Sequence, residues 1–274
     1  MIKLKKDKNG VININNLNVN LDCLSDVDAK YKFVKDNQIY YFKASSEKEA
    51  FREVFACEFA DKLNIEHANY DIASIDDHFG VISESIYGID EEFIPLCDIS
   101  DKLKIKKGYA NTVETMQKKI LPRLCFLNRK EELIKYIRMF VFDILLANDD
   151  RHEGNTGFIY KGSKYRLAPL FDNGNIVSDL CLRNQIYCQG ISNDLFDDGN
   201  NYVIIEFLSS KYAKYLVEEL EKLSINDLLS LVKEINEKYE YKFDIRYEQQ
   251  MVEQLGENLN KLNDLKNKYF IKRG

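Results

Sequence analysis

In the first third of the chain, apolar and polar residues alternate in short runs that are separated by turn-forming residues. A period of two residues predicts β-strands with one buried face. The predicted strands cover 11–14, 31–34, 38–42, 70–75 and 80–86, with a polar turn at 76–79. One helix interrupts them, because Ser46 is a suitable N-cap, Glu49 completes a capping box, and apolar residues recur at helical spacing as far as Asn64. We expect a sheet with one helix in this region.

Beyond about Gly88 the apolar residues follow helical spacing instead. The predicted helices cover 111–121, 131–147, 211–223, 225–239 and 247–269. Two short strands at 157–160 and 165–168 predict a hairpin, and residues 173–201 are typical of a long irregular connection. The sequence therefore predicts an α+β fold with two lobes: a β-rich N-lobe in residues 1–87 and a mainly helical C-lobe in residues 88–274.

A polar segment follows the predicted buried helix at 131–147. Asp150 and Asn155 have the D-x-x-x-x-N spacing of phosphoryl-transfer loops, in which Asp orients the attacking hydroxyl and Asn binds Mg²⁺. The hairpin would carry Asp172 back toward Asp150 as a second ligand, since Mg²⁺ prefers oxygen ligands. Alternatively, these residues only cap backbone groups in a turn between helix and hairpin.

Lys43 and Glu53 form a second candidate pair, because a strand carries the lysine and the next helix carries the glutamate. In protein kinases, a Lys–Glu ion pair in this order positions the phosphates of ATP. The alternative is a surface lysine beside a solvated glutamate. A polar segment between the lobes is the candidate adenine site, where backbone groups would bind the base: Ser83, Glu84, Ser85 and Ile86.

Composition narrows the classes of partner and compartment. The 274 residues are 45% hydrophobic, which suffices for a core, and 39 basic against 45 acidic residues give a net charge of −6. This balance argues against direct binding to nucleic acid or to a membrane surface. The six cysteines form no CxxC pair, the three histidines lack metal-ligand spacing, and no signal peptide or membrane helix is evident. We expect a cytoplasmic protein with free thiols.

Four features follow one another along the chain: Lys43, Glu53, the run D-R-H-x-x-N at 150–155 and the run A-P-L-F-D at 168–172. Together they resemble the HipA-like serine/threonine kinase family, over a stretch from about residue 24 to residue 172. The resemblance implies ATP and Mg²⁺ as cofactors. It implies the following roles: Asp150 as catalytic base, Asn155 and Asp172 as magnesium ligands, and Lys43, oriented by Glu53, as the partner of the α- and β-phosphates. Asp149 competes for the role of base but stands six residues before Asn155, and we expect His152 to brace the loop.

The resemblance continues in a segment that reads S-x-x-G-A-Q-x-K-F in the family, which residues 25–33 match in part. Asp28 and Lys30 replace the family's Gly and Gln. A phosphate loop needs a small residue for close approach of the backbone, so Asp28 would bring a carboxylate near ATP. Ser25 aligns with a serine that HipA-like kinases phosphorylate on themselves, although serine in a polar loop is also a common turn residue.

The resemblance implies transfer of the γ-phosphoryl group to a serine or threonine of a protein substrate. About two dozen residues precede the phosphate loop, where larger members of the family carry an extra N-terminal subdomain. In this respect the chain is similar to short members, in which that subdomain is absent or supplied by another small protein. An antitoxin or accessory protein is therefore an expected partner. Two alternatives stay open. One is a phosphatidylinositol or small-molecule kinase, since D-R-H-x-x-N also resembles the catalytic loop of phosphatidylinositol kinases. The other is a nucleotide-binding pseudokinase that acts through a partner.

Overall fold

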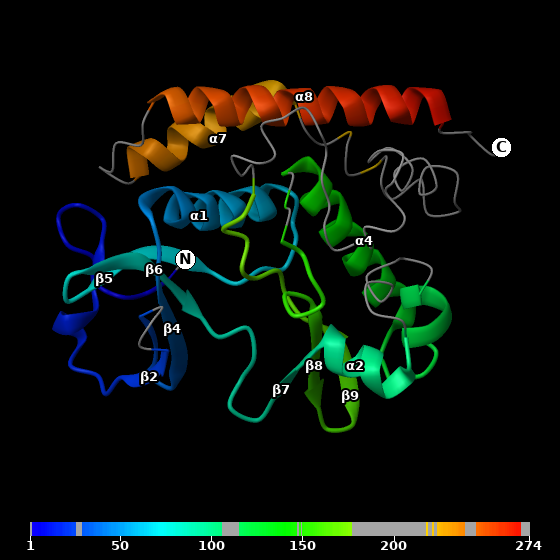
Figure 1. Ribbon diagram of the computed structural model, residues 1–274, viewed down its shortest axis with the longest axis horizontal. Coiled ribbons are helices and arrows are strands. Elements are labelled where there is room, and N and C mark those ends of the chain that lie inside the picture. Colours follow the sequence, from blue (N-terminus) through cyan, green and yellow to red (C-terminus); the bar gives the residue numbers. More distant parts are fainter. Residues whose placement is uncertain are drawn as a thin grey trace.

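The computed structural model describes residues 2–25, 29–105, 115–146, 148, 150–176, 218, 221, 224–238 and 245–269. Helices cover one side of a large sheet, and a smaller sheet lies beside it (Figure 1). Helix α8, at the top of the view, packs on α7, which in turn contacts α1 above the large sheet. Among the described residues, no helix combines the length and apolarity needed to cross a bilayer.

The large sheet has six strands in the order β1-β5-β6-β4-β3-β2, and all but the parallel β1–β5 pair are antiparallel. The strands are β1 (Ile12–Asn13), β2 (Asp22–Ser25), β3 (Lys30–Lys35), β4 (Gln38–Ala44), β5 (Tyr70–Ile75) and β6 (His78–Glu84). Asp36 and Asn37 both have positive φ in the two-residue turn between β3 and β4, as a tight hairpin requires. This turn fixes the register that sets Lys43 opposite Lys30 on β3 and Val81 on β6.

Helix α1 (Glu47–Lys62) packs on one face of this sheet and begins with the predicted capping box between Ser46 and Glu49. Its buried stripe of Phe51, Phe55 and Phe59 joins the main core. The ring of Phe59 lies 5.9 Å from that of Phe142 on α4 (Arg129–Leu145). A second apolar cluster, which includes Phe33, Phe42 and Ile82, contains the residues of the opposite face.

The small sheet positions the polar segment. Strands β7 (Glu92–Pro95), β8 (Gly157–Lys161) and β9 (Lys164–Leu167) pair in that order, and Gly162 and Ser163 turn between β8 and β9 with positive φ. The other helices are α2 (Leu96–Leu103), a π-helical turn (Met116–Ile120), α7 (Ile225–Lys238) and α8 (Ile245–Tyr269). The chain between α4 and β8 holds the predicted catalytic loop, and the chain after β9 reaches Asp172.

Most predicted elements are present within a few residues, and the α+β class is confirmed. The strand at 11–14 is only two residues long before a 3-10 turn (Ile14–Leu17), and the turn at 76–79 shortens to 76–77 because His78 pairs with Ile75. Strands β2 and β7 and helix α2 were not predicted. The helix at 211–223 and most of the connection at 173–201 lie outside the described residues. The boundary near Gly88 stays a prediction, although the large sheet lies before it and the small sheet after it.

Candidate active site

The predicted catalytic loop is anchored on the end of α4. The side-chain amide of Asn148 donates to Asp143 Oδ1 at 2.8 Å, and Asn148 Oδ1 accepts the backbone N–H of Asp150 at 3.1 Å. Asn148 is fully buried and Asp143 is 1% exposed. The loop therefore starts from a rigid, buried attachment, which suits a catalytic segment.

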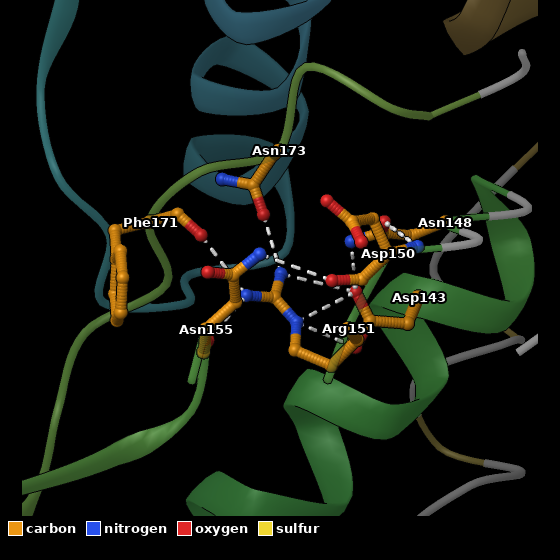
Figure 2. Close-up of polar contacts among 7 residues, drawn as sticks. All are labelled: Asp143, Asn148, Asp150, Arg151, Asn155, Phe171 and Asn173. Carbon is orange, nitrogen blue, oxygen red and sulfur yellow. Dashed lines mark hydrogen bonds and ion pairs between the residues drawn. The ribbon is translucent and has the colours of Figure 1, made fainter. Parts of the chain in front are cut away.

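Arg151 connects this loop to the segment that contains Asp172 (Figure 2). Its guanidinium donates to the carboxylate of Asp143, at 3.0 Å from Nε to Oδ2, and to the backbone carbonyls of Asn155 at 2.8 Å and Phe171 at 2.9 Å. It also donates to the side-chain oxygen of Asn173. One planar group with five donors thus fixes both segments in a single arrangement.

The Arg151–Asp143 pair is deeply buried, with 3% of the arginine and 1% of the aspartate exposed. Burial raises the pKa of the Asp143 carboxyl, while the positive charge of Arg151 and the hydrogen bonds of Arg151 and Asn148 act against that rise. Removing either charge would leave the other unpaired in the interior, which is strongly destabilising. The sequence analysis missed this pair. Its signals were an aspartate inside an apolar helix and an arginine inside the D-R-H run.

Asp150 carries the carboxylate predicted to act as base. Its Oδ2 accepts a hydrogen bond from Asn175 Nδ2 at 2.9 Å, and His152 Nε2 lies 3.9 Å from Oδ1. The carboxylate is partly open to solvent, with the side chain 37% exposed. Asn175 was not predicted, and it brings the chain after Asp172 into direct contact with the proposed base.

His152 lies on the outside of the loop. Its Nδ1 accepts the backbone N–H of Gly154 at 2.9 Å, and the backbone N–H of His152 donates to the carbonyl of Asp150 at 2.8 Å. These contacts stay within the loop and support the bracing role, which remains a prediction. The rival base Asp149 lies outside the described residues.

Asn155 and Asp172 supply the oxygen atoms expected of a magnesium site. The Nδ2 of Asn155 donates to the carbonyl of Asp150 at 3.1 Å, and no contact within the described part of the chain engages its Oδ1. Asp172 has a positive φ of 53°, which is rare for a residue other than glycine and is held by a hydrogen bond from its N–H to the Tyr70 hydroxyl at 2.9 Å. One amide oxygen and one carboxylate match the hard ligands that Mg²⁺ prefers.

Lys43 reaches this site from the large sheet. Its Nζ lies 3.0 Å from Asp172 Oδ1, across 129 residues of sequence. Burial acts to lower the pKa of Lys43, but Asp172 and, to a smaller extent, Glu53 and Glu49 together outweigh it, and the net pKa is raised. The ammonium is positively charged at neutral pH and stays accessible, with 46% of the side chain exposed.

Glu53 makes no direct ion pair with Lys43, whose Nζ contacts Asp172 instead, but the charges of Glu53 and Lys43 each shift the pKa of the other. Glu53 Oε2 accepts the backbone N–H of Asn173 at 2.8 Å, and Glu53 is 3% exposed, so the alternative of a solvated glutamate is wrong. A Cβ on Gly174 would lie 3.3 Å from Glu53 Oε1, so this backbone approaches closely. Burial, and then the negative charge of Asp172, raise the pKa of Glu53 to about 8. Glu53 therefore holds the segment after Asp172, and its role in orienting Lys43 stays a prediction.

A pocket of about 360 Å³ extends from Lys43 and Asp172 to the predicted adenine site. Its lining includes Lys43, Glu53, Asp172 and all four predicted residues from Ser83 to Ile86. Ser83 and Glu84 belong to β6, which has partners on both sides, and the N–H of Ser85 donates to the carbonyl of Ile39 at 2.9 Å. The first amide beyond these bonds is that of Ile86, so we expect Ile86 to contact the base. A larger, more open hollow of about 580 Å³ shares Glu84, Ser85 and Ile86 but none of the predicted catalytic groups.

Ser25 is the last residue of β2 and lies opposite Lys30, which lines the pocket. Asp28 lies outside the described residues, so the expected clash of its carboxylate with ATP stays a prediction.

Comparison with known proteins places the chain in a family. A family model described as the HipA-like C-terminal domain matches residues 25–203, about two thirds of the chain. The chain belongs to the HipA-like family. A stretch of 62 residues is 40% identical to the serine/threonine-protein kinase CtkA of Helicobacter pylori strain J99, which covers 21% of this chain and 18% of that protein.

Two solved structures share the fold. The crystal structure of the proinflammatory kinase CtkA of Helicobacter pylori has a TM-score of 0.67 at 17% identity, and the match covers 94% of this chain and 98% of that one. HipA in a complex with HipB and operator DNA from Shewanella oneidensis MR-1 has a TM-score of 0.58 at 14% identity, covering 89% and 67%. The kinase-like fold expected for this HipA-like chain is confirmed, and family membership supports a kinase-like function.

Proposed function

We propose that this HipA-like protein is an ATP- and Mg²⁺-dependent kinase that transfers the γ-phosphoryl group to a serine or threonine hydroxyl of a protein. The observation that carries the proposal is the contact of Lys43 Nζ with Asp172 Oδ1 at 3.0 Å at the pocket wall. Arg151 ties the Asp150–Asn155 loop to the same segment, which supports one shared site for Lys43, the proposed base Asp150 and the proposed metal ligands Asn155 and Asp172.

Each residue has a task that its position supports. Ile86 and its neighbours would bind adenine through backbone groups, and the ammonium of Lys43 would offset negative charge on the α- and β-phosphates. Asn155 and Asp172 would hold Mg²⁺, which when bound neutralises phosphate charge and orients the γ-phosphoryl group. Asp150 would orient the acceptor hydroxyl and take its proton as the bond to phosphorus forms.

Asn175 gives Asp150 a fixed direction before substrate arrives. Its Nδ2 occupies Oδ2 at 2.9 Å, so the acceptor hydroxyl would approach the other oxygen, Oδ1. His152 Nε2 lies 3.9 Å from Oδ1. We therefore expect the acceptor hydroxyl to approach Asp150 Oδ1 from the solvent side.

Self-phosphorylation at Ser25 and a small partner protein are part of the same proposal. Ser25 lies at the end of β2, opposite a pocket-lining residue, and is half-buried. The HipA of Shewanella oneidensis was solved with HipB, which supports an antitoxin or accessory protein as the partner of this chain.

The test is transfer of labelled γ-phosphate from ATP by the purified chain, with Mg²⁺ and then with excess chelator. Asp150→Asn should lower transfer by roughly 10²–10⁴-fold while nucleotide binding persists, because the base contributes to the chemical step. Asp77→Asn, at an exposed turn of the large sheet, is the matched control and should retain wild-type transfer.

The acceptor that receives the label separates this proposal from its alternatives. Label on a protein hydroxyl, or on Ser25, supports the proposal, and label confined to phosphatidylinositol vesicles identifies a lipid kinase. ATP binding without any transfer indicates a pseudokinase. Wild-type transfer by Asp150→Asn would exclude Asp150 as the base.

A further inference from the structure

The phosphate end of the pocket contains a second lysine that the family pattern does not place there. Lys30 on β3 lies directly opposite Lys43 on β4, and both line the pocket. Directly opposite residues of an antiparallel pair project from the same face, with Cβ atoms about 5 Å apart. Two ammonium-bearing side chains therefore enter one pocket from neighbouring strands.

This arrangement has an electrostatic cost, since like charges opposite one another on a sheet destabilise it. Among the described residues, the carboxyl groups that line the same pocket are those of Glu53, Glu84 and Asp172. Glu84 lies opposite Tyr40, three residues along β4 from Lys43 and so about 10 Å away. Glu53 binds the amide of Asn173, and Asp172 contacts Lys43. A polyanion bound in the pocket would lie against both lysines and offset the repulsion between them.

The two ends of the pocket match the two ends of a nucleotide. The predicted adenine site lies at the end of β6, and the lysines lie about 10 Å back along the sheet. A nucleoside triphosphate bound to Ile86 through its base would therefore extend its phosphates toward Lys30 and Lys43.

The sequence between β2 and β3 explains why a side chain is needed to contact the phosphates. Close approach of backbone to phosphate is easiest at glycine, and the residues between Ser25 and Lys30 include none. Lysine has a long flexible stem and carries its positive charge to a phosphate from several ångströms away. We propose that Lys30 binds the phosphates of the nucleotide and replaces the backbone contacts of a glycine-containing phosphate loop, a role that rests on the proposed kinase function.

The test is the affinity of purified variants for Mg-ATP, Mg-ADP and adenosine, measured by calorimetry. Lys30→Met keeps the length of the side chain and removes the charge, so Mg-ATP should bind roughly tenfold more weakly or worse, as for loss of a charge-assisted contact. Adenosine affinity should not change, and Lys30→Arg should recover most of the Mg-ATP affinity. Lys3→Met removes the same charge from an exposed position outside the pocket and should bind all three ligands as the wild type does.

The outcomes separate the two ideas. Equal Mg-ATP affinity of wild type and Lys30→Met overturns the role of Lys30 and leaves the kinase proposal standing. Weaker adenosine binding by the same factor also overturns it, because the loss is then not specific to phosphate. A wild-type protein that binds no nucleotide overturns the kinase proposal and the role of Lys30 together.

Discussion

At the scale of single residues, the sequence identifies side chains better than it identifies their partners. Asp150, Asn155 and Asp172 could be singled out from the sequence because short motifs record local geometry, and their roles stay predictions. The partner of Glu53 could not be predicted, since the N–H that it accepts belongs to Asn173, 120 residues further along. Arg151 was overlooked for the same reason: its hydrogen bonds reach Asp143, Phe171 and Asn173, and only the folded chain brings these together.

Glu53 gives a residue-scale prediction about pH. Its pKa is about 8 in the folded protein against a reference of 4.5, so the folded state keeps a proton that the unfolded state loses as pH rises between these values. The free energy of unfolding should therefore fall over this range because of Glu53, by at most about 5 kcal/mol. Glu53→Gln removes the titration, so its stability relative to wild type should rise from pH 4.5 to pH 8.

Denaturant unfolding at several pH values measures this difference. Glu47→Gln, an exposed carboxyl on the same helix, serves as the control and should show no comparable trend. If the difference in free energy of unfolding between wild type and Glu53→Gln does not change with pH, Glu53 is not protonated in the folded protein.

At the scale of elements, the hairpin and helix α1 follow from local sequence, but strands β2 and β7 and helix α2 do not. The turn at Gly162 and Ser163 and the capping box at Ser46 are local devices, and both elements form where expected. Strand β7 is short, ends in a proline and pairs only with β8, more than 60 residues away, so nothing near it in sequence indicates a strand. Proline is tolerated there because β7 is an edge strand.

The connection between α4 and the segment after β9 gives an element-scale prediction. Arg151→Met should destabilise the protein by about 3–5 kcal/mol, because it leaves Asp143 buried and unpaired. The double variant Asp143→Leu with Arg151→Met removes both charges and should recover much of that stability. Transfer activity should stay low in the double variant, because the hydrogen bonds from Arg151 to Asn155, Phe171 and Asn173 are then lost.

Thermal or denaturant unfolding together with the transfer assay separates these effects. Arg166→Met, which removes a surface arginine paired with Glu91, is the control and should change stability by less than about 1 kcal/mol. A double variant with both stability and transfer restored would show that Arg151 acts only in folding.

At the scale of the whole molecule, the account depends on two parts of the chain meeting at one pocket. The class of fold could be predicted from the change in periodicity near Gly88, since a period of two gives way to helical spacing there. The meeting itself was implied by the family resemblance and not by periodicity, because it requires Lys43 of the large sheet to reach Asp172 beyond the small one. Shared core packing supports it, with α1 in contact with the large sheet, α7 and, through Phe59, α4.

The most direct test of this convergence is a crystal structure with Mn²⁺ and a non-hydrolysable ATP analogue, in which anomalous scattering locates the metal. The account predicts an anomalous peak bound by Asn155 Oδ1 and the Asp172 carboxylate, with the phosphates between that peak and Lys43. A metal bound elsewhere, or phosphates away from Lys43 in a fully occupied complex, would contradict it.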